Sequence, residues 1–242
     1  MADKAMRAAL SHVSAWVFDL DNTLYPADSS VFPAIDVRMT EYVAEFLDLP
    51  HDDARSIQKT YYARHGTTLK GLMQEHGMAP EDFLHYVHEV DLSPLTPCNR
   101  LRAAISALPG RKYVYTNGSR RHAERVTRHM GLDHLFDGMS GIEDCHYHPK
   151  PDPRAYYRFC DLHALEPSQS IFFEDLSRNL VPAHAMGFTT VLVRSDVDWS
   201  HEPEIARPAR RGDDLGAHVH YVTEDLAGFL LEAAPETQDT PP

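Results

Sequence analysis

The sequence predicts an α/β protein with a Rossmann-like parallel sheet and an all-helical segment inserted after the first strand. Short apolar runs alternate with helical patterns along most of the 242 residues, which is typical of a parallel sheet with helices on both faces. Residues 26–95 break this alternation, because they carry helical patterns and no convincing buried strand. Since loops of about seventy residues are rare in compact domains, we expect a helical subdomain there.

Each strand is predicted from a short apolar run that ends in polar residues. The expected strands are 15–19, 112–116, 170–174 and 189–193, with a weaker candidate at 219–222. Helical spacing of apolar residues in the inserted segment predicts four helices, at about 31–48, 52–64, 68–76 and 80–90. Three more helices are expected between the later strands: from a Ser119 cap to Gly131, from Pro153 to His163, and from a Ser177 cap to Gly187.

The expected domains follow from these elements. Residues 1–25 and 96–232 should form the Rossmann-like core, and residues 26–95 the helical subdomain. The polar segment 195–217 is interpreted as a surface loop. Residues 233–242, which are rich in Pro, Thr and acidic residues, are expected to be a disordered tail.

Polar residues follow three of the predicted strands. Asp19 and Asp21 follow the first, the segment 116–118 follows the second, and Glu174 with Asp175 follows the third. Because ligand sites of parallel α/β sheets lie outside the carboxyl ends of the strands, we expect these groups to converge on one crevice. Two carboxylates two residues apart suit a nucleophile and an acid/base that act on one phosphoryl group around a metal.

In order along the chain, these motifs resemble those of the haloacid dehalogenase (HAD) superfamily of phosphohydrolases. Asp19-Leu20-Asp21-Asn22-Thr23 is similar to the first motif and Thr116-Asn117-Gly118 to the second. Lys150, between two prolines, is similar to the third motif, and Glu174-Asp175 to the fourth. The resemblance extends over about residues 14–195. It implies the HAD fold, in which an all-helical cap is inserted after the first strand.

The resemblance also implies a role for each motif. Asp19 is expected to attack phosphorus and form an aspartyl-phosphate, and Asp21 to protonate the leaving oxygen and then to activate water. Lys150 would offset negative charge on Asp19 and on the phosphoryl group. The segment 116–118 would hold the phosphate oxygens through the hydroxyl of its threonine and its backbone.

A metal is expected as well. The available ligands are all oxygen, which favours Mg²⁺. The resemblance implies that Mg²⁺ is held by the side chains of Asp19 and Asp175 and by the backbone carbonyl of Asp21. Glu174 would act through water or orient Lys150.

The segment from Tyr61 to Leu72 is distinctive because two glycines interrupt its helical pattern, which predicts a loop between helices. It resembles the cap segment of the pyrimidine 5'-nucleotidase group, as does the run from Tyr115 to Ser119. In this interpretation the aromatic ring of Tyr61 stacks on a base. Arg64, His65 or Thr67 would form hydrogen bonds to the polar edge of that base. An inter-helix turn with packing tyrosines is an equally weighted interpretation.

Composition narrows the class of protein. The formal net charge is 23 − 36 = −13, which argues against a general nucleic-acid binder. Three widely spaced cysteines fit free thiols in a reducing cytoplasm. No apolar run approaches the roughly 18 residues of a membrane span, and the first residues lack the apolar core of a signal peptide. We therefore expect a cytoplasmic protein with a small-molecule phosphate monoester as its partner, and neither a nucleic-acid polymer nor a membrane.

The sequence favours a Mg²⁺-dependent phosphatase of nucleoside 5'-monophosphates, with pyrimidine nucleotides preferred. Phosphatases of sugar phosphates or phosphoglycolate, and a phosphomutase of the β-phosphoglucomutase type, would keep the same motifs and remain alternatives. A haloacid dehalogenase needs neither Asp21 nor Asp175, and a non-enzymatic binding module would be expected to lack one of the catalytic groups. The leaving group and the oligomeric state stay open.

Overall fold

The computed structural model describes residues 2–213 and 215–235. Its described part contains a six-stranded sheet in the order β3-β2-β1-β4-β5-β6, in which every pair of neighbours is parallel. The strands are β1 (Ala15–Phe18), β2 (Arg111–Tyr115), β3 (Gly138–Ser140), β4 (Ser170–Glu174), β5 (Thr189–Val193) and β6 (Tyr221–Thr223). The strand order reverses direction between β1 and β4, and such a switch point opens the crevice in which α/β proteins bind ligands. The predicted Rossmann-like α/β fold is confirmed.

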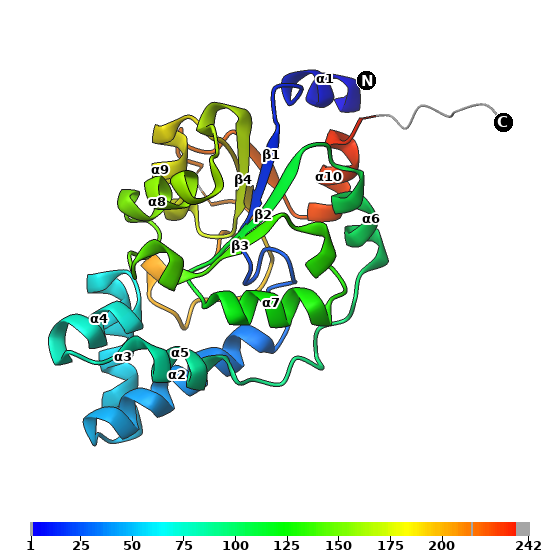
Figure 1. Ribbon diagram of the computed structural model, residues 1–242. Coiled ribbons are helices and arrows are strands. Elements are labelled where there is room, and N and C mark those ends of the chain that lie inside the picture. Colours follow the sequence, from blue (N-terminus) through cyan, green and yellow to red (C-terminus); the bar gives the residue numbers. More distant parts are fainter. Residues whose placement is uncertain (1, 214, 236–242) are drawn as a thin grey trace.

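Helices cover both faces of the sheet because alternate residues of each strand point to opposite faces. Trp16 and Phe18 of β1 belong to one apolar cluster, together with residues of α6 (Asn99–Ala107), α7 (Arg120–His129) and α10 (Leu226–Ala233). Ala15 and Val17 belong to a second cluster, together with residues of α8 (Pro153–His163) and α9 (Ser177–Met186). Figure 1 shows α8 and α9 on one side of the sheet and α6 and α10 on the other. A further helix, α1 (Ala2–Ala9), precedes the first strand.

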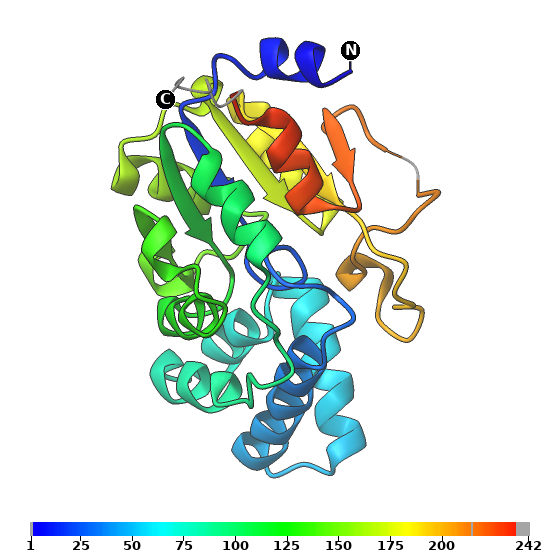
Figure 2. The same ribbon diagram turned by 90° about the vertical axis from the view of Figure 1, so that its right-hand side faces the viewer.

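The chain between β1 and α6 forms four helices. They are α2 (Val31–Leu47), α3 (His51–His65), α4 (Thr68–His76) and α5 (Pro80–His88), and we refer to them together as the helical insert. Figures 1 and 2 show the helical insert as a group beyond the carboxyl ends of the strands. Its buried residues, such as Ile35 and Phe83, join the apolar cluster of one sheet face. The helical insert is thus packed against the edge of the sheet at which the polar motifs lie.

Several local predictions need correction. Ser119 does cap α7, since its hydroxyl accepts from the His122 backbone N–H, but Ser177 is the first residue of α9 and Leu176 stands at the cap without a side-chain bond. Gly66 ends α3 with a φ of 89°, whereas Gly71 lies inside α4, where its Cα faces Tyr61. Only one of the two glycines therefore interrupts the helical pattern, because a left-handed conformation is required at the first and close packing at the second.

The ends of the chain also differ from the expectation. Ala233 closes α10, and Ala234 is 4% exposed within the core, so the expected tail does not begin at residue 233. The remainder of that predicted tail, 236–242, lies outside the described residues. Three described helices, α1, α6 and α10, and the short strand β3 were not predicted. Among the described residues, no helix is long and apolar enough to cross a membrane.

Candidate active site

The predicted site residues meet at the carboxyl ends of the three central strands. Asp19 follows β1, Thr116 follows β2, and Glu174 ends β4 with Asp175 directly after it. The apolar side chains of these strands are buried on both faces, so the chain can turn polar only where each strand leaves the sheet. This arrangement brings Asp19, Asp21, Thr116, Asn117, Gly118, Lys150 and Asp175 to the lining of one pocket.

Lys150 is the central cation of this pocket, and its side chain is 1% exposed. Its Nζ donates to Asp19 Oδ1 at 2.6 Å, to Glu174 Oε2 at 2.7 Å and to the Tyr115 carbonyl at 3.0 Å. Asn117 holds the loop that carries the lysine: its Oδ1 accepts from Lys150 N at 2.7 Å and its Nδ2 donates to Lys150 O at 3.1 Å. The side chain of Asn117 therefore positions Lys150, a role that the sequence did not suggest.

Three buried carboxylates surround the ammonium group. Asp19, Glu174 and Asp175 each offer an oxygen, and these oxygens lie within 4.8 Å of one another. Burial, followed by the charge of Glu174, raises the pKa of Asp19 to about 8. The same two causes hold the pKa of Asp175 well above its ordinary value. Three acids against one lysine leave an excess of buried negative charge, and a cluster of oxygen ligands with that excess fits a divalent cation such as Mg²⁺.

Two asparagines support these acids. Asn179 Nδ2 donates to Glu174 Oε1 at 2.9 Å, and Asn22 Nδ2 lies 3.4 Å from Asp175 Oδ2. Neither asparagine amide nitrogen can ligate a metal, so both side chains orient carboxylates through their N–H groups. The Oδ1 atoms of Asn22 and Asn179 are buried without a partner in the described structure, which leaves two polar acceptors free near the acidic cluster.

Asp21 has a different environment from Asp19. Its side chain is 16% exposed, and its Oδ1 accepts from Tyr25 Oη at 2.5 Å and from His122 Nε2 at 3.1 Å. Burial by itself would raise the pKa of Asp21, but the nearby His122 and the hydrogen bonds from His122 and Tyr25 bring that pKa below its ordinary value. The pKa of Asp19 is therefore raised and that of Asp21 lowered, as is typical of two acids with different roles in one site.

The segment 116–118 leads from β2 into α7. Thr116 is buried, and its Oγ1 accepts from Gly118 N at 2.9 Å, which folds the segment into a tight turn. A Cβ on Gly118 would lie 3.3 Å from both Thr116 Oγ1 and His88 Nε2, so a larger residue would crowd this turn. Ser119 then starts α7, so the positive end of the helix dipole lies beside the pocket.

The helical insert lines the opposite wall of the pocket, but largely with residues other than those predicted. Of the predicted contacts only Thr67 is in the lining, and its Oγ1 is engaged in capping α4. Tyr61 Oη is 2.7 Å from His76 Nε2, and His65 Nδ1 is 2.9 Å from Gln74 Oε1, both at the surface. Arg64 is exposed as well.

The predicted residues of α3 miss the pocket because of the way this helix is rotated about its axis. Residues three and four positions apart share a helix face, so Gln58, Lys59 and Tyr62 line the pocket while Tyr61 turns toward Gly71 of the neighbouring helix. The predicted segment thus reaches the pocket through Thr67, while the face of α3 that lines the pocket carries other residues.

The loop between β5 and β6 also enters the pocket, which corrects its interpretation as a surface loop. Trp199 is 4% exposed and packs edge-on against Phe32, with ring centroids 6.1 Å apart. Glu202 is 8% exposed and accepts from Lys59 Nζ at 2.6 Å and from Arg55 at 3.3 Å. Both loop residues line the pocket. A tryptophan in an otherwise polar loop was the signal that sequence reasoning passed over.

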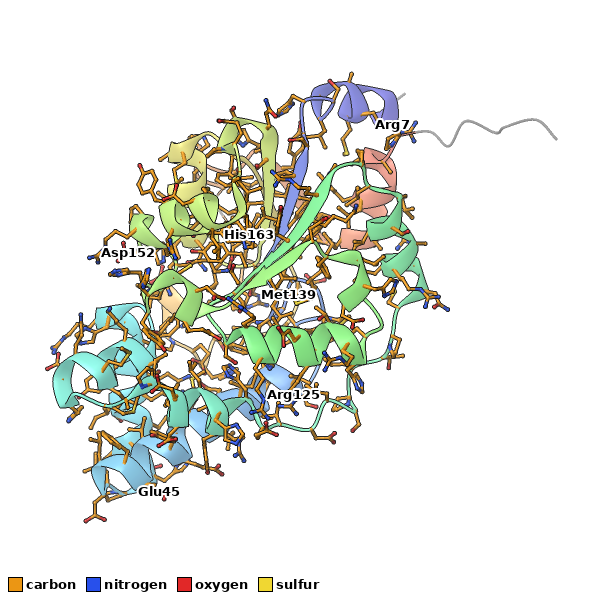
Figure 3. The ribbon with its side chains drawn as sticks, viewed as in Figure 1. Arg7, Glu45, Arg125, Met139, Asp152 and His163 are labelled. Carbon is orange, nitrogen blue, oxygen red and sulfur yellow. The ribbon has the colours of Figure 1, made fainter. Side chains whose placement is uncertain are left out.

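Figure 3 draws the side chains of the described residues on the ribbon. The pocket at the switch point of the sheet has the features of a hydrolytic site. Asp19 is a potential nucleophile held by the buried Lys150, Asp21 is a second carboxylate two residues further on, and an acidic cluster lies beside them.

Comparisons with known proteins agree with this class. The family model of haloacid dehalogenase-like hydrolases matches residues 13–187, so the chain belongs to this family. It is 28% identical over 209 residues to phosphate metabolism protein 8 of Saccharomyces cerevisiae, which covers 77% of this chain and 63% of the yeast protein. It is 36% identical over 99 residues to a phosphoglycolate phosphatase of Haemophilus influenzae, which covers 36% of this chain and 43% of that enzyme. The chain thus spans less than two thirds of the length of these relatives.

Solved structures show the same fold. A predicted phosphoglycolate phosphatase from Haemophilus somnus superposes with a TM-score of 0.58 at 18% identity, covering 90% of this chain and 97% of the other. An L-2-haloacid dehalogenase superposes with a TM-score of 0.57 at 20% identity, covering 92% and 100%. These two structures show that the chain shares their fold, and the chemistry has to be argued from the site.

Proposed function

We propose that this protein is a Mg²⁺-dependent phosphatase that hydrolyses phosphate monoesters through an aspartyl-phosphate on Asp19. The observation that carries the proposal is the bond of 2.6 Å between Lys150 Nζ and Asp19 Oδ1 inside the pocket. Burial opposes ionisation of Asp19, and the ammonium group favours it. An ionised carboxylate is the form that can attack phosphorus.

The acidic cluster supports the metal. Asp19 and Asp175 would hold Mg²⁺ through their side chains, and Asp21 through its backbone carbonyl. The bound ion would neutralise charge on the phosphoryl oxygens and on the buried acids. A dehalogenase has no use for this excess of acids, which favours phosphoryl chemistry over carbon–halogen cleavage.

Two steps follow from the positions of the two aspartates. In the first, an Asp19 oxygen forms a bond to phosphorus while the bond from phosphorus to the leaving oxygen breaks, and Asp21 gives its proton to that oxygen. In the second, Asp21 takes a proton from water as the water oxygen attacks phosphorus and releases Asp19. The lowered pKa of Asp21 suits the second step. A bound phosphate dianion beside the carboxyl would raise that pKa for the first step, because like charges disfavour ionisation.

The remaining pocket supports a nucleoside 5'-monophosphate as the substrate, with pyrimidine nucleotides preferred. Phe32, Tyr62 and Trp199 present aromatic rings, on which a base can stack. Gln58 and Lys59 add polar groups, and the buried Trp199 Nε1 has no partner among the described residues. A base that offers an acceptor would satisfy this donor.

Phosphoglycolate is a second candidate substrate. The Haemophilus influenzae relative is named a phosphoglycolate phosphatase, and Lys59 in the pocket could pair with a carboxylate. Lys59 is already held by Asp36 and Glu202 at 2.6 Å each, which weighs against a second anion there. We further propose a cytoplasmic location, because all three cysteines are free thiols.

A panel of esters tests the function. kcat/KM is measured with Mg²⁺ for the uridine, cytidine, adenosine and guanosine monophosphates, glucose 6-phosphate and phosphoglycolate. Tyr62→Leu and Trp199→Leu should lower the value for pyrimidine nucleotides by about ten- to a hundredfold, since stacking contributes roughly 1–3 kcal/mol per base. Tyr61→Leu is the matched control, because Tyr61 neighbours Tyr62 on α3 and faces away from the pocket. A tenfold advantage for phosphoglycolate or glucose 6-phosphate would overturn the nucleotide assignment and leave the phosphatase.

A further inference from the structure

Two buried histidines lie behind Asp21 and belong to none of the recognised motifs. His88 is the last residue of α5, in the helical insert, and His122 lies in the first turn of α7, in the core. Their side chains are almost fully buried, and their rings stack with centroids 4.5 Å apart and planes inclined by 18°. The pair therefore joins the helical insert to the core directly beside the expected acid/base.

His122 directs a donor at one oxygen of Asp21. Its Nε2 is 3.1 Å from Asp21 Oδ1, and its Nδ1 is buried without a partner in the described structure. Because an unpaired buried N–H is costly, we assign the ring proton to Nε2, which donates to the carboxylate. Tyr25 Oη donates to the same Oδ1 at 2.5 Å. Within residues 2–213 and 215–235, no hydrogen bond reaches Oδ2, so this oxygen is the one available to a substrate.

His88 is itself held from both sides. Its Nδ1 is 2.8 Å from the Leu84 carbonyl of α5 and 3.1 Å from Ser119 Oγ at the start of α7. The carbonyl of His88 accepts from Arg125, labelled in Figure 3, at 2.6 Å. The ring of His88 can therefore shift little, and it backs the face of His122 that lies toward the helical insert.

We propose that His122 and Tyr25 are positioning residues that clamp Oδ1 of Asp21 and thereby aim Oδ2 at the leaving oxygen, and that His88 supports the ring of His122 from the helical insert. The inference deepens the proposed phosphatase function and rests on it. A carboxyl with one oxygen tied in this way keeps one rotamer, so the proton is transferred at a defined atom. Loss of these two hydrogen bonds should therefore lower the rates of the proton-transfer steps and leave substrate binding unchanged.

The test compares two leaving groups. kcat and KM are measured for 4-nitrophenyl phosphate, whose leaving oxygen needs little protonation, and for the alkyl phosphate that is cleaved fastest in the panel above. The variants are Asp21→Asn, His122→Leu, His122→Gln and Tyr25→Phe, and the folded state of each is checked by thermal unfolding. His129→Leu is the control, since His129 is exposed on the same helix and bonds only the Leu95 carbonyl.

We expect His122→Leu to lower kcat for the alkyl phosphate by about ten- to a hundredfold, as is usual when a group that orients a functional residue is lost, with KM unchanged. The first turnover of 4-nitrophenyl phosphate should be spared and appear as a burst of nitrophenol. His122→Gln keeps an N–H donor near the position of Nε2 and should recover most of the loss. His88→Leu should show the same pattern with a smaller effect.

The outcomes separate the inference from the function on which it rests. The outcomes are judged on the first turnover, because the second step needs Asp21 with either ester. If the wild type cleaves neither ester, or Asp21→Asn slows the first turnover of both esters equally, the proposed function fails and the inference falls with it. If Asp21→Asn spares the first turnover of 4-nitrophenyl phosphate but His122→Leu slows the first turnover of both esters alike or of neither, the phosphatase stands and the positioning role is refuted. A similar loss in His122→Gln and His122→Leu would also refute it, because the donor would then not be what matters.

Discussion

Replacement of Lys150 by methionine tests the electrostatic design of the site most directly. The methionine keeps most of the length and apolar volume of the side chain and removes its charge. Lys150→Met leaves Asp19 and Glu174 without the donor that lies 2.6 and 2.7 Å away. Hydrogen bonds to charged groups contribute roughly 1.5–3 kcal/mol each, so two of them amount to about 3–6 kcal/mol. This range agrees with the cost of about 3–5 kcal/mol for removing one partner from a buried ion pair.

The loss of stability in Lys150→Met should depend on pH, because the Asp19 carboxyl that Lys150 contacts changes its charge with pH. Asp19 has a pKa of about 8 in the folded protein and 3.8 as its reference, so the unfolded chain ionises first and the fold loses stability as pH rises from 3.8 toward 8. Without the ammonium group that pKa would be higher still. At pH 9 the wild type is ionised with a partner and the variant is not, so the difference in stability is largest. At pH 6 Asp19 is protonated in both proteins and the difference shrinks.

Urea unfolding in EDTA, followed by circular dichroism at pH 9 and pH 6, measures both effects. We expect Lys150→Met to lower the free energy of unfolding by about 4 kcal/mol at pH 9 and by clearly less at pH 6. Lys112→Met is the control, because its Nζ bonds only the nearby Gly110 carbonyl, and it should change stability by less than about 0.5 kcal/mol. A loss below about 1 kcal/mol at pH 9, or an equal loss at both pH values, would refute this account of the cluster.

Three further predictions concern the nucleophile, the metal and a buried histidine. Asp19→Asn should lower turnover by roughly 10⁴-fold or more with the fold intact, and near wild-type phosphatase activity in that variant would exclude the aspartyl-phosphate. EDTA should abolish activity, Mg²⁺ should restore it and Ca²⁺ should restore it poorly, while Asp175→Ala should raise the Mg²⁺ concentration required; full activity after exhaustive chelation would contradict the metal assignment. Burial, and then His122, lower the pKa of His88 to about 3, so folding keeps it neutral and its contribution to stability is lost as pH falls from about 6.5 toward 3. This contribution changes by roughly 2 kcal/mol between pH 7.5 and pH 5. In urea unfolding, the free energy of unfolding of His88→Leu should therefore vary less with pH than that of the wild type, by that amount. An unchanged pH dependence would show that His88 is not the titrating group.

The sequence by itself determined the parallel α/β core and the residues that follow its strands. Strands that are buried on both faces leave short continuous runs of apolar residues, and the chain can become polar only where a strand ends. Asp19, Thr116 and Asp175 were therefore placed at one sheet edge by local information, and Lys150 by its resemblance to a family motif. Elements with weaker local patterns, such as the edge strand β3, were missed because three residues at a sheet edge carry little periodicity.

Only the tertiary structure decided which face of each surrounding element looks into the pocket. A helical pattern predicts α3 but not its rotation, and packing against α2 and α4 turned Tyr62 inward and Tyr61 outward. Trp199 entered the pocket because its loop folds back over the helical insert. The rings of His88 and His122 stack although the two residues lie far apart in the sequence, on α5 and α7. Contacts of this kind depend on how rigid elements dock, and no local pattern of residues records that docking.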